Sequence, residues 1–442
     1  MKFVNRKTTV ALMASLGLCA QAVAAPNEQF IPVPVFKTGP ISPIGSSIAG
    51  GLIDYFDLVN KRDGGVGGVK LTWEECETAF QVDRIVECYE RLKKKSPAGA
   101  SFFTSYSTSA VYALTERTRE DKIPMAHVNT GRTDASDGRV FPYIFPLGAN
   151  LWSGSTATIR YIGSRESGMD KLKGKKIANL WLSTGFGKES IPILDIQAKK
   201  YGFEVTHIEV PLPGMEQQAQ WLRVRQLKPD WVILQLAGVS VSAALKMAQR
   251  VAYPADHLVG FYGASGEEDV IPVGDAAKGY IAWAFAPSGT QFPVIREIQK
   301  TLYSGGKRGN MEDPKRVGTV NYNAGVVNGI VHTEAIRVAQ GKYGKQPLTG
   351  EQIQWGFEHL NINDKRLKQL GAIGLVPNIK VSCADHEGGG GAKFHQWDGS
   401  KWVTITDWVP SDRSLVRPMV EEAAAKYARE KGMTPRDCSK ES

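Results

Sequence analysis

The chain has 442 residues, of which 42% are hydrophobic, and a formal net charge of +9. This length favours two or three domains with ample apolar core. The excess positive charge is spread along the chain, and its one tight cluster, residues 91–95, is interpreted as the solvated end of a helix. The charge therefore argues against a nucleic-acid-binding protein.

The N-terminus has the pattern of a secretory signal peptide. Basic residues precede a short apolar segment, residues 9–18, and Ala22-Val23-Ala24 matches a cleavage site before Ala25. The apolar segment is too short to cross a bilayer, and no later segment approaches the roughly 20 apolar residues of a membrane helix. Lipidation at Cys19 is disfavoured, because a large residue precedes it where a small one is needed. We expect residues 1–24 to be removed on export.

The next segment predicts a strand, a loop, a helix and a second strand. Residues 30–36 form a short apolar run, and residues 38–45 form a turn rich in Gly, Pro and Ser. Apolar residues then recur at helical spacing up to Asn60, before a glycine-rich loop and a strand over residues 69–73. The first loop lies at the carboxyl end of a strand, which is the usual ligand position in open α/β sheets. We place Ile41 of this loop at the candidate site.

Strands and helices alternate along the rest of the chain. Further strands are predicted at 100–103, 125–128, 176–182, 204–210, 231–236, 257–261 and 279–284. Helices are predicted at 83–95, 111–121, 191–201, 217–227 and 240–252, with longer helical stretches around 293–303 and 323–341. Such alternation favours an α/β fold with parallel sheets and right-handed crossovers. Near the C-terminus, an aromatic-rich run around Asp398-Gly399 predicts a β-hairpin.

Four cysteines remain after the signal is removed. Cys76, Cys88, Cys383 and Cys438 are an even set in an oxidising compartment and are candidates for disulfides. A Cys76–Cys88 bond would tie a strand end to the next helix, and a Cys383–Cys438 bond would attach the C-terminal tail to the body. Four cysteines permit three pairings, and the sequence leaves the choice open. The spacing of the cysteines does not match a zinc site.

The opening unit and the alternation that follows resemble the periplasmic solute-binding proteins of branched-chain amino-acid-type ABC importers. The resemblance rests on the order and spacing of elements over nearly the whole mature chain. It implies the two-lobed type I periplasmic binding fold, in which each lobe is a mostly parallel sheet flanked by helices and the chain crosses between lobes three times. Breaks in the pattern suit crossings near residues 142–148, 286–289 and 373–384.

These crossings give the expected domain boundaries. Lobe one is expected to comprise residues 25–147 and 286–376, and lobe two residues 148–285. Residues 377–442 would form the third crossing and a C-terminal extension that packs mainly on lobe two. The resemblance also implies a monomer in the periplasm that captures a small molecule by lobe closure and delivers it to ABC permease subunits.

The ligand's carboxylate is expected to bind lobe one. Residues 104–109 are six consecutive hydroxyl-bearing residues at the start of a predicted helix, which is more than helix capping needs. In the resembled family a serine of this loop and a residue after the next strand hold the carboxylate. The corresponding positions here are Ser105, with Tyr106 and Ser107 beside it, and the segment Asn129-Thr130-Gly131. The alternative is that these residues are only caps and turn formers.

Lobe two is expected to cover the apolar part of the ligand. Phe186 occupies the place of a family Tyr-Gly wall, and Tyr262 and Gly263 follow the strand after which amino-acid binders carry a glutamate for the ligand's ammonium. This chain has no acid there until Glu267. A buried ammonium without a counter-charge is costly, which favours an apolar or aromatic carboxylate without an amine. Branched-chain amino acid, amide or urea binding, or a ligand-sensing receptor domain, is the alternative.

No cofactor, metal or catalytic activity is expected. The sequence has no nucleophile elbow, P-loop, zinc-protease motif or dinucleotide fingerprint, and an exported hydrolase would need an activated nucleophile that is not visible. Asp385-His386-Glu387 contains three types of metal ligand, but adjacent side chains rarely converge on one ion. Contact with the ligand or the hinge is the preferred interpretation of this segment.

Overall fold

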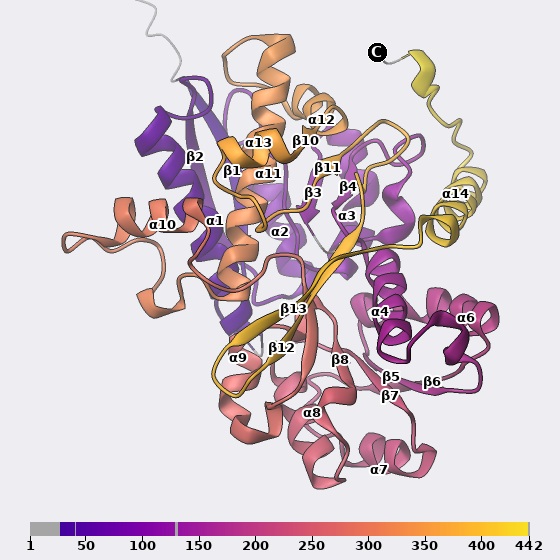
Figure 1. Ribbon diagram of the computed structural model, residues 1–442. Coiled ribbons are helices and arrows are strands. Elements are labelled where there is room, and N and C mark those ends of the chain that lie inside the picture. The colour runs from indigo at the N-terminus through magenta and orange to yellow at the C-terminus, as the bar shows by residue number, and fades with distance from the viewer. Residues whose placement is uncertain (1–26, 40, 129–130, 441–442) are drawn as a thin grey trace, which may run out of the picture.

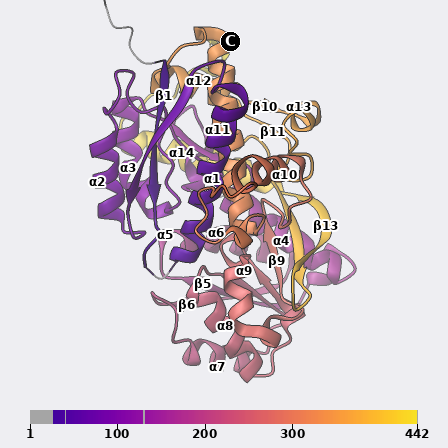
Figure 2. The same ribbon diagram turned by 90° about the vertical axis from the view of Figure 1, so that its left-hand side faces the viewer.

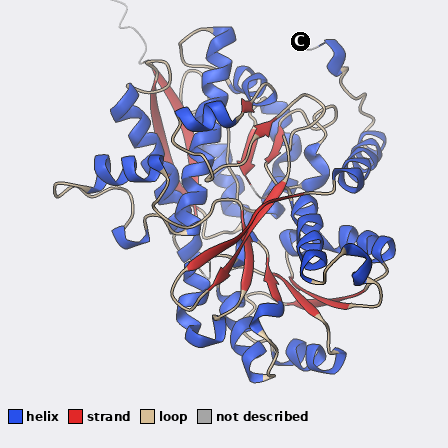
Figure 3. Ribbon diagram, viewed as in Figure 1, coloured by secondary structure: helices blue, strands red, loops and turns tan. Residues whose placement is uncertain are grey.

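The computed structural model describes residues 27–39, 41–128 and 131–440, which form two lobes (Figure 1). The predicted signal peptide, and Asn129 and Thr130 of the predicted site, lie outside the described residues. The fold is α/β, with mainly parallel sheets flanked by helices on both sides (Figure 3).

The first lobe is built on two parallel strand pairs, β1 with β2 and β3 with β4. An isolated bridge between Phe103 and Met125 lies beside β3. The helices pack around these strands, and a short antiparallel pair, β10 and β11, joins them. The elements of this lobe are β1 (Glu28–Val35), α1 (Ser42–Asp63), β2 (Lys70–Glu77), α2 (Val82–Leu92), α3 (Thr108–Asp121), β3 (Met125–Val128), β4 (Ile144–Leu147), α10 (Pro293–Ile298), α11 (Val320–Tyr343), α12 (Gly350–Glu358), β10 (Asn361–Ile362), α13 (Asp364–Gln369) and β11 (Ile379–Lys380).

The second lobe contains a seven-stranded sheet in the order β13-β12-β9-β8-β7-β5-β6. The five strands from β9 to β6 are parallel, and the C-terminal hairpin adds β12 and β13 in antiparallel pairing. Its elements are α4 (Leu151–Arg165), β5 (Lys176–Leu182), α5 (Gly185–Lys188), α6 (Ser190–Tyr201), β6 (Glu204–Val210), α7 (Gln218–Leu227), β7 (Trp231–Gln235), α8 (Val239–Arg250), β8 (Leu258–Gly260), α9 (Glu267–Val270), β9 (Ile281–Ala284), β12 (Gly391–Trp397) and β13 (Trp402–Pro410). A last helix, α14 (Arg413–Glu430), follows the hairpin.

Glycine lets the two longest helices of the first lobe, α1 and α11, cross closely. A β-carbon on Gly51 would lie 2.0 Å from the Tyr322 carbonyl oxygen, and one on Gly325 would lie 2.1 Å from the Ile48 carbonyl oxygen. No side chain fits at either position, since real β-carbons do not approach within 3.0 Å. This close crossing holds the N-terminal half of α1 against α11, above the second lobe (Figure 2).

The chain passes between the lobes where β4, β9 and β11 end. The first and third of these passages touch, because the Gly148 N–H donates to the Glu387 carbonyl oxygen at 2.8 Å. Helix α14 contacts both lobes: Val416 and Val420 pack against Trp152 of α4, whereas Ala424 and Ala428 belong to a cluster with Phe141 of the first lobe.

Two disulfides are present, and their pairing is one of the three that four cysteines permit. Cys76–Cys88 joins β2 to α2 with a Cα–Cα distance of 5.9 Å, and Cys383–Cys438 joins the third passage to the C-terminal segment at 5.7 Å. Within the part of the chain that the structure describes, no helix combines the length and apolar character needed to cross a membrane.

Most predicted elements are present, but one strand prediction was wrong. Strands β3, β5 and β6 have the predicted bounds, and the C-terminal hairpin is present. The segment predicted as a strand at 100–103 instead links two sheets: the Ser101 N–H donates to Phe30 of β1 at 3.1 Å, and the Phe103 N–H donates to Pro124 at 2.8 Å. Because its partners change from one strand to another within three residues, no regular ladder forms.

Candidate ligand-binding site

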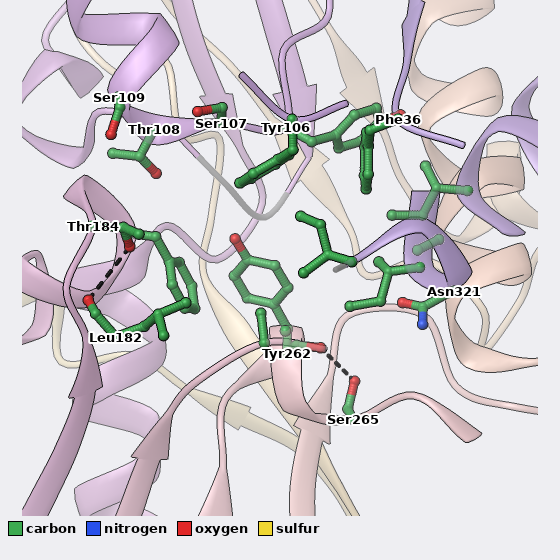
Figure 4. A pocket seen from close by; sticks show the side chains of 18 of the residues that line it. Phe36, Tyr106, Ser107, Thr108, Ser109, Leu182, Thr184, Tyr262, Ser265 and Asn321 are labelled. Atoms are coloured by element: carbon green, nitrogen blue, oxygen red, sulfur yellow. Dashed lines mark hydrogen bonds between the residues drawn. The ribbon is translucent and has the colours of Figure 1, made fainter. Parts of the chain in front are cut away.

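A cavity of about 410 Å³ lies between the two lobes (Figure 4). It is bordered by the N-terminal half of α1, the start of α3 and one face of α11 from the first lobe, and by the loops after β5, β6, β7 and β8 from the second. The side chains on its wall are mostly apolar: Phe36, Ile41, Ile44, Ile48, Phe80, Tyr106, Val128, Leu182, Phe186, Leu212, Pro213, Ala237, Tyr262, Phe285, Val320 and Ala324.

No charged side chain is among the described residues that line the cavity. The nearest acids of α9 are engaged elsewhere. Glu267 accepts from the Val320 N–H at 2.9 Å, while Glu268 accepts from the Ser47 hydroxyl at 2.9 Å and pairs with Arg316. Neither carboxylate is therefore available to pair with an ammonium group in the cavity.

Hydroxyl groups gather at one end of the cavity, where α3 and α5 begin (Figure 4). Ser107 caps α3 by accepting from the Ala110 N–H at 3.4 Å, and Thr184 caps α5 by accepting from the Gly187 N–H at 3.2 Å. Ser109 accepts from the Gly185 N–H at 3.4 Å, which joins the two helix starts across the cleft. Thr108 is 2% exposed, and its hydroxyl oxygen has no hydrogen-bond partner within the described residues. It is therefore a spare hydroxyl on the wall of an apolar cavity.

Aromatic rings form two facing walls. Phe36 lies 5.2 Å from Phe80 and 5.9 Å from Tyr106 between ring centroids in the first lobe. From the second lobe, Phe186 and Tyr262 meet edge to face at 5.6 Å. Edge-to-face rings at such a distance attract each other beyond simple burial, which helps to order the wall of the second lobe.

Six of the predicted site residues lie on this cavity: Ile41, Tyr106, Ser107, Phe186, Tyr262 and Gly263. Gly263 is packed tightly, because a β-carbon there would lie 3.1 Å from the Leu236 carbonyl oxygen. Contact between these residues and a ligand stays a prediction.

Two predicted residues are placed behind the wall. Ser105 is buried, and its hydroxyl accepts from the Ser107 N–H at 3.3 Å, so it closes its own turn and does not line the cavity. Gly131 has a φ of +111° and lies against the His127 imidazole, where a β-carbon would be 1.8 Å from Nε2. Asn129 and Thr130 lie outside the described residues.

Sequence reasoning missed several wall residues. The predicted helix includes Ile48, but Ile44 falls in the predicted turn 38–45, and Leu212 and Pro213 are not singled out. Helix α1 begins at Ser42, within that turn, so Ile44 and Ile48 lie four residues apart on one face of the helix.

Asp385-His386-Glu387 belongs to the passage between the lobes and does not line the cavity. His386 is fully buried, with Nδ1 2.8 Å from the Ile144 carbonyl oxygen and Nε2 2.9 Å from Glu358 Oε1. Burial raises the pKa of Glu387 to about 8. The described residues contain no group of three side chains placed to hold a metal ion.

The two lobes and the apolar cavity between them are suited to enclosing a small molecule. Residues 28–401 match the family described as periplasmic binding protein, and the chain belongs to this family. A solved structure described as an ABC transporter permease from the Pseudomonas fluorescens group is 46% identical, with a TM-score of 0.88, and the match covers 93% of this chain and 100% of that one.

Two more distant structures share the fold. A branched-chain amino acid ABC transporter protein from Thermus thermophilus with bound valine is 21% identical, with a TM-score of 0.71, and the match covers 89% of this chain and 99% of that one. A solute-binding protein of an ABC transporter from R. palustris, in complex with benzoate, is 16% identical, with a TM-score of 0.67, over 87% of this chain and 97% of that one. No match was found among curated protein sequences. This chain is thus a solute-binding protein of the type I periplasmic binding class.

Proposed function

We propose that this protein is the extracytoplasmic solute-binding component of an ABC importer and captures an apolar or aromatic carboxylate. The observation that carries the proposal is the cavity between the lobes, which has hydroxyl groups at one end and no charged side chain among its described lining residues. One similar structure is described with bound valine and another in complex with benzoate, so an amino acid and an aromatic carboxylate both occur as ligands on this fold.

The carboxylate would bind at the start of α3. The N-terminus of a helix carries partial positive charge and free N–H groups, which stabilise an anion. The hydroxyls of Thr108 and Ser109 would add neutral donors at the same place, whereas the Thr184 hydroxyl donates to the Leu182 carbonyl oxygen at 3.4 Å. An amino acid would also bury its ammonium group, and no lining acid among the described residues pairs with it, so amino acids would bind poorly.

The apolar part of the ligand would lie between the aromatic walls. Phe36 and Tyr106 approach it from the first lobe and Phe186 and Tyr262 from the second, so closure of the lobes would bury it completely. Lobe closure of this kind is a hinge transition, with lobe one at residues 25–147 and 286–376 and lobe two at 148–285. The closed monomer would then dock on the permease subunits, and the ligand would leave chemically unchanged.

Export to the periplasm through cleavage before Ala25 is part of the proposal. It is supported by the two disulfides, which persist in an oxidising compartment. N-terminal sequencing of protein from the periplasmic fraction tests it, and a mature protein that begins at Met1 contradicts it.

A ligand panel tests the proposed function. Benzoate, phenylpropenoate, leucine and urea are added separately, and the thermal unfolding temperature is measured. We expect stabilisation by the carboxylates without an amine, and loss of that stabilisation in Thr108→Val. Thr206→Val on β6, away from the cavity, is the matched control. Strong stabilisation by leucine and none by the aromatic acids would overturn the proposed ligand class.

A further inference from the structure

The cavity is larger than benzoate and valine, the ligands of two of the similar structures. A cavity of about 150 Å³ holds one benzene molecule, so by the same packing about 410 Å³ holds roughly 16 non-hydrogen atoms. Benzoate and valine have about half that number. Either ligand would leave much of the cavity wall uncovered, and the uncovered side chains would lack dispersion contacts with a ligand.

The polar groups of the wall are unevenly distributed. Ser109, Thr108 and Thr184 gather at one end, and Asn321 marks the opposite end (Figure 4). Gln81, Ser265 and Asn328 also line the cavity, and the last two bond backbone groups: Ser265 donates to the Tyr262 carbonyl oxygen at 2.6 Å and Asn328 to that of Ala324 at 2.9 Å. The Asn321 amide does not offer a second polar subsite, because its NH₂ group donates to Glu268 Oε2 at 2.9 Å. A ligand with one polar head and a long apolar body therefore matches the wall better than a ligand with two polar ends.

The end away from the hydroxyls is an apolar surface of its own. Phe36, Ile44 and Ile48 form a buried cluster separate from the main cores, with Ile41, Phe80, Tyr106 and Ala237 packed against it. Ala324 of α11 reaches the same cavity beside Gly325, which lies against the Ile48 carbonyl oxygen. The small part of this cluster that faces the cavity is apolar, so the apolar body of a ligand can cover it.

We propose that the ligand is an acyl-chain-like carboxylate, whose head lies at Thr108 and whose apolar body of about a dozen carbon atoms reaches Ile44 and Ile48. This inference rests on the proposed function and adds the size and shape of the ligand. Each methylene buried along the apolar wall improves affinity by about fourfold. Affinity should therefore increase with chain length until the cavity is full, and then stop.

Calorimetric titration of the intact mature protein with benzoate, octanoate, dodecanoate and hexadecanoate, each below its micelle concentration, tests the inference. We expect dodecanoate to bind on the order of 100-fold more tightly than octanoate, and hexadecanoate to bind no more tightly than dodecanoate. Equal affinities for octanoate and dodecanoate, tighter binding of benzoate than of dodecanoate, or a further rise at hexadecanoate would overturn the inference and leave carboxylate capture intact. Absence of binding by all four would refute the proposed function itself.

A variant at the apolar end gives an independent readout. Ala324→Leu adds three carbon atoms to the far wall and should lower the affinity for dodecanoate at least tenfold while the affinity for octanoate stays within threefold. Ala425→Leu, on the exposed side of α14, should change neither affinity. If Ala324→Leu lowers both affinities equally while thermal unfolding shows a folded protein, the acyl chain does not reach this end and the inference is wrong.

Discussion

Glu189 is a buried acid held between the lobes, and its removal should change how stability depends on pH. It lies where α5 meets α6 in the second lobe, and both of its carboxylate oxygens accept from the Thr133 N–H at 3.3 and 3.4 Å. It also accepts from the Tyr112 hydroxyl at 3.2 Å. Burial, and then the nearby carboxylate of Asp134, raise the pKa of Glu189 to about 8 from 4.5. Arg132, the nearby cation, is bonded to Asp134.

The direction of the effect follows from this raised pKa. The folded state binds the proton more tightly than the unfolded chain, so the contribution of Glu189 to stability is greatest below about pH 4 and is lost as the pH rises through 8. Each pKa unit corresponds to about 1.4 kcal/mol, so the full shift corresponds to on the order of 5 kcal/mol. Glu189→Gln keeps the shape and the hydrogen-bond acceptor but cannot ionise.

Urea unfolding at pH 5, 7 and 9 measures this difference. At pH 5 we expect similar stabilities for the wild type and Glu189→Gln, because Glu189 is protonated in the folded protein. At pH 9 the variant should be more stable by several kcal/mol. Glu204→Gln, on an exposed position of β6, is the control and should follow the wild type. A constant difference between Glu189→Gln and wild type at all three pH values would refute the reasoning.

Three further predictions test how the fold is held together. Removing Cys383–Cys438, which closes a loop of 55 residues, by paired Cys→Ser substitution should cost about 4 kcal/mol, against about 3 kcal/mol for the 12-residue Cys76–Cys88 loop. Urea unfolding of the two variants shows whether the order holds, and a larger loss for Cys76–Cys88 would contradict it. Asp54 is fully buried and accepts hydrogen bonds from Tyr303, Tyr322 and Asn310. Asp54→Ala should lower the free energy of unfolding by about 3 to 5 kcal/mol, because these buried donors would lose their acceptor. Asp256→Ala, at an exposed position, is the control in the same assay, and a similar loss of stability in the two variants would contradict this prediction. Gly51→Ala should force α1 and α11 apart and lower the melting temperature by several degrees, whereas Gly341→Ala, with no atom within 4 Å of its β-carbon, should not.

The order of elements was readable from sequence because local patterns set it. Lys176–Leu182 is a largely apolar run between Lys175 and Ser183, and Glu204–Val210 ends at Pro211, which cannot donate to a strand ladder, so even the limits of these strands were predictable. The C-terminal helix α14 was missed, although Val416, Val420, Ala424 and Ala428 recur every fourth residue on its buried face. Two of these four residues are alanines, which bury little surface, and Pro418 interrupts the helix interior, so the apolar signal was weak.

The site was harder to predict than the fold, because a sequence position does not fix the direction of a side chain. Ser105 and Thr108 lie three residues apart in one hydroxyl-rich segment. The Ser105 hydroxyl turns back to the Ser107 N–H, whereas Thr108 begins α3 and lines the cavity. Capping rules predict that one hydroxyl in such a segment bonds the backbone, but not which one. Leu212 and Pro213 reach the cavity only because the loop after β6 folds towards the first lobe, which is a tertiary effect.

The distribution of charge separates closure of the lobes from choice of ligand. Two acids of the second lobe bind donors of the first: Glu189 accepts from Tyr112 and Thr133, and Glu268 accepts from Ser47 and pairs with Arg316. Neither acid lines the cavity, whose described wall is neutral. The contacts of Glu189, and those of Glu268 with Ser47 and Arg316, therefore involve no lining residue, whereas the Ser109–Gly185 and Asn321–Glu268 hydrogen bonds join the lobes at the cavity wall. On the proposed function, ligands would be distinguished by the apolar surface that they cover and by the hydroxyl-lined corner at α3. A wall of this kind would select ligands by their size and would disfavour a ligand with a second polar group. Burying a polar atom without a hydrogen-bond partner costs more binding free energy than one buried methylene contributes.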